Sequence, residues 1–213
     1  MKTNQFTPGS LCALFVLVAL PLGAAETWIR YDALPTGSLV KLDGTSSLHD
    51  WTVECRLVAG RAEFDPAFNL DQPAPGKVNA RLEVMIPVRQ LKSGKSGMDT
   101  VMYDALKQSL QPRIFYRLTD ISGKEAPRAS GEPFVLDAKG ELAVSGVTNK
   151  VDMAVTVTHA GKDRLKFSGA TAVKMTSFGI EPPSPRGTFG LISTGDDVKI
   201  TFEWLTEKNP DPK

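Results

Sequence analysis

The stretch that decides the fold reads SGMDTVMYDALKQSLQPRIFYRL, residues 96–118, in which an expected helix leads directly into an expected strand. Ser96 with Asp99 three residues later resembles a capping box at a helix start. Pro112 ends the helix, because proline disfavours helical geometry at the residue before it. The residues that follow, 114–118, are rich in β formers. The apolar residues in between recur at the spacing of one helix face, and they are Met98, Val101, Met102, Ala105, Leu106 and Leu110. The pattern predicts one amphipathic helix and then a strand.

On both sides of this stretch the sequence alternates apolar and polar residues, which is typical of strands with one buried face. Residues 137–140, Asp-Ala-Lys-Gly, favour a hairpin turn between strands at 134–136 and 142–144. The other expected strands are 39–42, 51–59, 78–86, 114–121, 151–157, 165–175 and 198–204. Roughly eight strands predict an all-β, antiparallel fold, either a sandwich or a closed barrel, with the single helix plugging one end.

The two ends of the chain differ from this pattern. Lys2 precedes an apolar run at 11–22, and small residues follow at 22–25. These features predict a signal peptide over residues 1–25, and therefore an exported protein. The apolar run is too short for a comfortable membrane span, and no later segment resembles one, so no integral membrane span is expected. The sequence predicts one domain over 26–206 and a disordered polar tail over 207–213.

Charge and cysteine content exclude some classes of protein. The chain has 25 basic and 24 acidic side chains, and loss of Lys2 with the signal peptide would leave 24 of each. A balanced charge offers no electrostatic footprint for nucleic acid, so no nucleic-acid partner is expected. Loss of Cys12 would leave Cys55 alone, without a partner for an internal disulfide. We interpret Cys55 as a small buried apolar residue.

The sequence offers little for catalysis. Its only histidines are His49 and His159, and a zinc site would need His49, Asp50 and Cys55 to converge. No G-x-S-x-G elbow for a nucleophilic serine occurs. A turn leading into the strand at Trp51 is the simpler interpretation of His49. We therefore expect no catalytic residues, no metal and no cofactor, and a metal-dependent enzyme using His49 is the least favoured hypothesis.

The segment before the helix carries two lysines near a Gly-Lys-Ser sequence. Gly94-Lys95-Ser96 resembles the end of a phosphate-binding loop, but Arg89 occupies the position where that motif requires glycine. A weaker interpretation remains, in which Lys92 and Lys95 hold a phosphate or carboxylate head group at the helix start. The alternative is a solvated basic loop.

The interior is expected to be apolar, and it is either a filled core or a cavity for an apolar ligand. Methionines suit such a cavity, because a flexible thioether adapts to irregular ligands. The candidate ligand-binding residues are Trp51, Val53, Leu82, Val84, Met98, Met102, Leu106, Met153, Phe167, Val173 and Phe178.

Several segments resemble the YceI-like proteins of bacterial periplasms. The most specific is GELAVSGVTNK at 140–150, which resembles the family's strand–turn–strand. Further similar segments are IPVRQL at 86–91, PRIFY at 112–116, SFGI at 177–180 and GDDVKI at 195–200. The first hairpin, residues 44–64, differs from the family's usual sequence. The resemblance implies a lipocalin-like antiparallel barrel whose apolar tunnel binds an isoprenoid chain or a similar amphipathic lipid.

These observations lead to two hypotheses. The first is a periplasmic binding or carrier protein that holds an apolar or amphipathic, isoprenoid-like lipid in the barrel, with any head group near Lys92, Lys95 or the loop at 178–195. The second is a non-enzymatic interaction or structural protein whose barrel is filled. Either protein could form a homodimer, on which the sequence gives no evidence.

Overall fold

The computed structural model describes residues 27–184 and 193–210, and the expected signal peptide lies outside the described residues. One helix, α1, spans Ser96–Ala105, and short 3-10 turns lie at Val88–Gln90 and Thr176–Phe178. The strands are β1 (Ile29–Ala33), β2 (Leu39–Ser46), β3 (Trp51–Cys55), β4 (Ala59–Phe64), β5 (Gly76–Lys77), β6 (Ala80–Pro87), β7 (Arg113–Gly123), β8 (Phe134–Val144), β9 (Val147–Gly161), β10 (Arg164–Lys174) and β11 (Thr194–Lys208).

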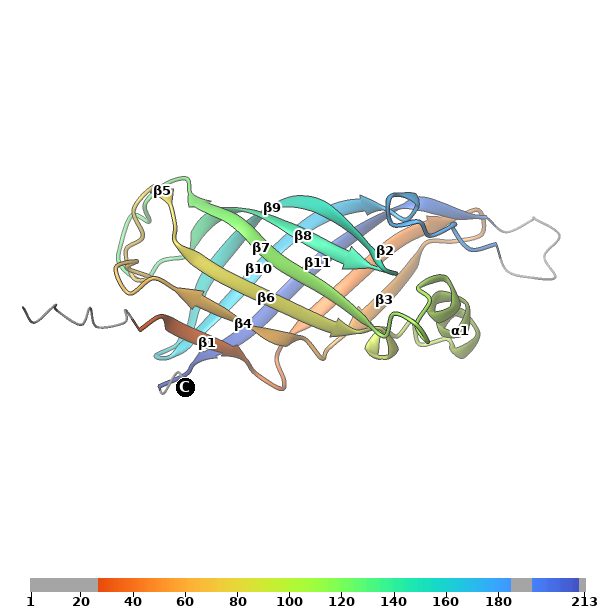
Figure 1. Ribbon diagram of the computed structural model, residues 1–213, viewed down its shortest axis with the longest axis horizontal. Helices are drawn as coiled ribbons and strands as arrows, with labels where there is room; N and C mark the ends of the chain where they lie inside the picture. The colour runs from red at the N-terminus through yellow and green to blue at the C-terminus, as the bar shows by residue number, and fades with distance from the viewer. Residues whose placement is uncertain (1–26, 185–192, 211–213) are drawn as a thin grey trace, which may run out of the picture.

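The strands form one antiparallel sheet that closes on itself (Figure 1). Neighbours follow the order β1-β4-β6-β7-β8-β9-β10-β11, and β1 also pairs with β11, so these strands complete a ring. The long β11 pairs with β1 near its carboxyl end and with β2 over 194–203. β3 extends the sheet beyond β2, and paired backbone hydrogen bonds of 2.8 Å join Glu54 to Lys92 on the far side. The prediction of a closed antiparallel barrel is confirmed, and the sandwich is excluded.

The two ends of the barrel are closed in different ways. Helix α1 lies across one end, and β1, β4 and the carboxyl terminus lie toward the other (Figure 1). At this second end, the rings of Phe64 and Phe167 stack 6.4 Å apart, and Phe167 lies 5.4 Å from Trp204. All three side chains are almost fully buried. Packed aromatic side chains therefore fill the end of the barrel opposite α1.

The hairpin predicted at 137–140 is wrong, because β8 runs through these residues without a break. The turn lies instead at Ser145 and Gly146, which both have positive φ, as a tight two-residue hairpin connection requires. Gly140 is not a turn residue, because its role is to let the Tyr116 ring pack directly against the backbone of β8. A Cβ atom at this position would lie 2.3 Å from the Tyr116 ring.

The strand predicted at 51–59 is divided in two. β3 ends at Cys55 and β4 begins at Ala59, and Leu57 in the connection is 41% exposed. Cys55 itself is a buried free cysteine, as its interpretation as a core residue required. At the other end of the chain, β11 continues to Lys208, so the boundary expected after residue 206 falls inside a strand.

Helix α1 is shorter than predicted, and its start is built differently. It ends at Ala105, and Leu110 is 79% exposed and does not belong to the apolar face. The capping box is also wrong: the residue at the cap is Lys95, and no side chain caps the helix. Asp99 instead accepts hydrogen bonds from the backbone N–H and the hydroxyl of Ser93, at 2.8 and 2.6 Å. These bonds tie the first turn of α1 to the segment before it.

We expect Asp99→Asn to destabilise the protein by about 1–2 kcal/mol at pH 7, because the amide oxygen that replaces the carboxylate accepts the two hydrogen bonds without a negative charge. Burial acts to raise the pKa of Asp99, but the hydrogen bonds from Ser93 and the charge of Lys92 lower it below its ordinary value. The carboxylate therefore stabilises the fold at neutral pH, and this contribution is lost as pH falls through the titration range of the carboxyl. Denaturant unfolding at pH 7 and pH 3 measures the difference between wild type and variant, which should shrink at pH 3. Asp104→Asn, at an exposed position on the same helix, is the control and should change little at either pH.

Candidate functional site

The interior of the barrel contains two adjoining cavities. The larger one, of about 430 Å³, lies beside α1, β2 and β3. The smaller one, of about 130 Å³, lies deeper, and Phe64, Phe167 and Trp204 of the aromatic end line it. Both cavities are lined by Val40, Ile86, Leu142 and Ile200, so one continues behind the other along the barrel. The larger cavity is within the range of roughly 300–1,000 Å³ that is typical of small-molecule sites.

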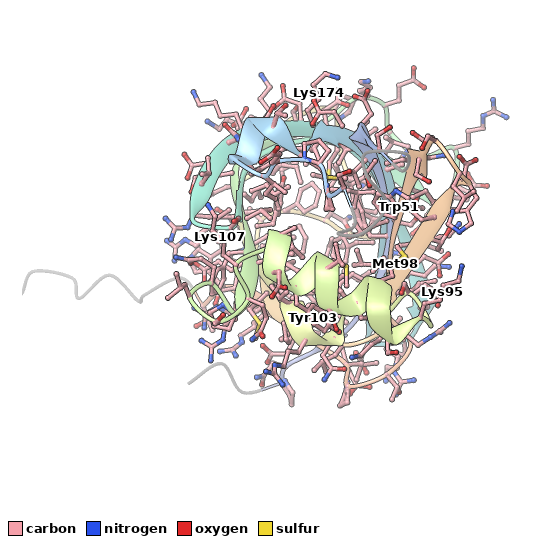
Figure 2. All side chains as sticks on the ribbon, turned by 90° about the vertical axis from the view of Figure 1, so that its right-hand side faces the viewer. Trp51, Lys95, Met98, Tyr103, Lys107 and Lys174 are labelled. Carbon is pink, nitrogen blue, oxygen red and sulfur yellow. The ribbon has the colours of Figure 1, made fainter. Side chains whose placement is uncertain are left out.

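The walls of the cavities consist of the inward-facing side chains of the strands, which are every second residue, and of one face of α1. Val53 points inward between two outward-facing residues of β3, and Val173 does the same on β10. On α1, the inward residues are those of its three- and four-residue repeat: Met98, Val101, Met102 and Ala105. Figure 2 looks onto this end of the barrel and shows Trp51 and Met98 on the same side of it, with Lys107 beyond the other end of α1.

Each of the apolar residues predicted from the sequence lines one of the two cavities. The larger cavity is lined by Trp51, Val53, Met98, Met102, Leu106, Val173 and Phe178. The smaller cavity is lined by Leu82, Val84, Met153 and Phe167. The sequence reasoning missed residues that contribute equally to the wall, and these include Val40, Ile86, Ile114, Leu142 and Ile200. Alternation along the strands places each of these side chains on the inner face, although the wrong turn at 137–140 interrupted the alternation of β8 before Leu142.

The two lysines predicted for a head group are in different places. Lys95 lines the larger cavity, whereas Lys92 does not. The Lys92 ammonium donates a hydrogen bond of 2.7 Å to the Tyr103 hydroxyl, which in turn lies 2.8 Å from the Leu91 carbonyl oxygen. The bond to Tyr103 raises the pKa of Lys92 above its ordinary value. Lys92 therefore stabilises the position of α1 through Tyr103. Of the two lysines, only Lys95 lines the larger cavity.

His49 also lines the larger cavity. The sequence favoured a turn residue over a metal ligand at this position. His49 does belong to the turn between β2 and β3, where its backbone N–H donates to the Ser46 hydroxyl. Its side chain faces Lys95, and His49 Nε2 lies 3.4 Å from Lys95 Nζ. Among the described residues, no three His, Cys, Asp or Glu side chains gather closely enough to hold a metal ion.

The smaller cavity is lined by two residues whose polar atoms have no partner. The hydroxyl of Tyr116 and the indole N–H of Trp204 are buried, and neither makes a hydrogen bond. Burial raises the pKa of Tyr116 to about 12. Buried polar atoms are normally hydrogen-bonded, so these two atoms are exceptions among the buried polar atoms of the described residues.

We expect Tyr116→Phe to leave the free energy of unfolding unchanged or to raise it by up to about 1 kcal/mol, because it removes a buried hydroxyl without a partner. Tyr103→Phe is the matched comparison and should cost about 1–2 kcal/mol, since that hydroxyl has partners. Denaturant unfolding measures both variants.

The raised pKa of Tyr116 adds a test at alkaline pH. The hydroxyl keeps its proton in the folded chain when the unfolded chain has already lost it, so stability should fall as pH rises from 10 toward about 12. Tyr116→Phe should show a smaller fall. An equal fall in both proteins would contradict the burial of this hydroxyl.

Within residues 27–184 and 193–210, no helix is long and apolar enough to cross a membrane. Solved structures with a similar fold are known. This chain resembles the crystal structure of Burkholderia cenocepacia BcnA, with 18% identity, a TM-score of 0.59, and coverage of 79% of this chain and 95% of that one. A polyisoprenoid binding domain from Saccharophagus degradans, implicated in plant cell wall breakdown, has 16% identity and a TM-score of 0.60, with 84% and 98% covered.

A third similar structure is the Campylobacter jejuni YceI protein, with 13% identity, a TM-score of 0.51, and 97% of this chain and all of that chain (100%) covered. At identities this low, the structural similarity establishes a shared fold and no more. No curated protein matches the chain. Residues 35–204, which are most of the chain, match the model of the YceI-like domain, and the chain therefore belongs to the YceI-like family.

Proposed function

We propose that this protein binds an apolar or amphipathic lipid with an isoprenoid-like chain inside its barrel. The observation that carries the proposal is the pair of adjoining cavities, whose walls are almost entirely apolar side chains. Empty space of this size inside a core is costly to a fold, so its presence favours a ligand that occupies it. The filled-barrel alternative requires an interior without such space.

The shape of the interior suits a chain rather than a compact molecule. The cavities follow one another along the barrel, from α1 to the aromatic side chains of Phe64, Phe167 and Trp204. Each methylene that moves from water into such a cavity contributes about 0.8 kcal/mol. A long hydrocarbon chain would therefore gain most of its affinity from burial.

The relatives support the same class of ligand. The Saccharophagus degradans domain with this fold is described as polyisoprenoid-binding. The signal peptide expected at residues 1–25 and the family resemblance favour export to the periplasm, where a carrier would shield a lipid from water. We propose no catalytic role. Whether two copies associate is a separate question, which sedimentation of the purified protein answers.

The test is to purify the protein from the periplasm of its native host, extract it with organic solvent and identify bound lipids by mass spectrometry. A control sample of a periplasmic protein of another fold, purified in parallel, identifies lipids that adhere without specificity. Delipidated protein should then gain thermal stability when a polyprenol is added, because a ligand that binds only the folded state stabilises it. Empty extracts, together with an unchanged melting temperature in the presence of every lipid tried, would refute the proposal.

A further inference from the structure

The polar residues on the wall of the larger cavity gather in one place. Apart from glycine and proline, they are Ser46, His49, Lys95 and Thr194. Ser46 is the last residue of β2, and His49 lies in the turn after it. Lys95 occupies the N-cap position of α1, and Thr194, the first residue of β11, pairs with Ser46. We call this set the polar rim. All other described residues in the wall of the larger cavity are apolar, so the polar rim is the place that the described part of this wall offers to the polar end of an elongated ligand.

Two of the four rim residues already have hydrogen-bond partners. The Ser46 hydroxyl donates to the His49 carbonyl oxygen at 2.7 Å, and the Thr194 hydroxyl donates to the Pro183 carbonyl oxygen at 2.6 Å. The nearby indole N–H of Trp51 is also engaged, since it donates to the Thr45 carbonyl oxygen at 3.1 Å. The side chains of Lys95 and His49 are therefore the groups of the polar rim that remain for a ligand.

Within residues 27–184 and 193–210, the Lys95 ammonium has no acidic partner. Among the described residues, neither Lys95 nor His49 takes part in an ion pair, and their side chains contact each other at 3.4 Å. Two carboxylates of this end have other partners: Asp99 binds Ser93, and Asp196 binds Thr176. A lysine beside an imidazole, without a counter-ion, is an arrangement that an anion can complete by accepting hydrogen bonds from both groups.

We propose that the ligand is an anionic amphiphile whose carboxylate or phosphate head binds Lys95 and His49 at the polar rim, while its apolar chain extends along Trp51 and Met98 into the cavities. This inference rests on the proposed lipid-binding function and adds the charge of the head group and the direction of the chain. Hydrogen bonds to charged groups are among the stronger ones in proteins.

The test compares lipids that differ only in the head group, by calorimetry or displacement of a fluorescent lipid from delipidated protein. Hexadecanoate against hexadecanol tests a carboxylate, and geranylgeranyl phosphate against geranylgeraniol tests a phosphate on an isoprenoid chain. The two pairs distinguish a fatty acid from an isoprenoid phosphate as the lipid that carries the anionic head group. The anionic member of at least one pair should bind about tenfold tighter than its alcohol.

Variants assign this preference to named residues. Lys95→Met should remove most of the preference and His49→Gln part of it, and Lys95→Glu should reverse it, while the affinity for the alcohols changes little. Lys92→Met is the matched control, because Lys92 lies three residues away, carries the same charge and faces Tyr103 rather than the cavity. It should keep the preference. Melting temperatures measured beside each titration confirm that the variants are folded.

The possible failures are distinguishable. If the alcohols bind as tightly as the anions, the anionic head group is refuted and lipid binding stands. If the preference is present but survives both Lys95→Met and Lys95→Glu, the assignment to the polar rim is refuted. If no member of either pair binds, the proposed function fails together with this inference.

Discussion

Replacing Gly60 with alanine is expected to lower the free energy of unfolding by about 3 kcal/mol or more, which few single substitutions do. Gly60 lies in β4 opposite Val84 of β6, with a φ of +149° that L side chains rarely adopt. A Cβ atom there would lie 2.2 Å from the Glu83 carbonyl oxygen and 2.9 Å from the Val84 Cα atom. Both are backbone atoms of a paired strand, so relief of the clash would require β4 and β6 to separate. Denaturant unfolding measures the loss.

Gly97→Ala is the control for this prediction. Gly97 lies in the first turn of α1, where a Cβ atom would meet nothing within 4 Å. Alanine is a better helix former than glycine, so this variant should be more stable by about 0.5–1 kcal/mol. Opposite signs for the two variants would show that the backbone contact, rather than glycine content, decides the effect. A loss below 1 kcal/mol for Gly60→Ala would contradict the close approach of β4 and β6.

The wall of the barrel was largely predictable from the sequence, because alternation is a local property. The inward positions Val53, Val84 and Val173 follow from counting every second residue. The hairpin at 137–140 failed for a non-local reason. Asp-Ala-Lys-Gly has the composition of a turn, but Gly140 is required by the Tyr116 ring, 24 positions earlier in the chain.

The candidate site was less predictable, since a cavity and a filled core have the same sequence pattern. The Val53 side chain is 1% exposed, as a residue of a filled core would be, yet it lines the larger cavity. Lys92 and Lys95 could not be distinguished either. Lys92 binds the Tyr103 hydroxyl, and that contact exists only once α1 lies across the barrel end. Lys95 meets His49 only in the folded chain, where backbone hydrogen bonds between Glu54 and Lys92 hold the β2–β3 hairpin beside the start of α1.

Blocking the larger cavity should produce the greatest loss of ligand binding. Val173 of β10 lines this cavity, and tryptophan is well tolerated in strands. We expect Val173→Trp to occupy space that the lipid chain would use. If the indole displaces about three methylenes, at about 0.8 kcal/mol each, the affinity falls by about 50-fold. Titration of the delipidated variant with a polyprenol measures the loss.

Ala172→Trp provides the matched control, because it adds the same indole to the same strand one position earlier. Ala172 is exposed, and its inward neighbours Thr171 and Val173 line the cavities, so its side chain points away from the interior. This variant should bind polyprenol as the wild type does. Val173→Trp should in addition melt close to the wild-type temperature in the absence of lipid, since the new ring enters empty space rather than a packed core. Equal affinities for the two variants would place the lipid outside the barrel, and the cavities would then need another explanation.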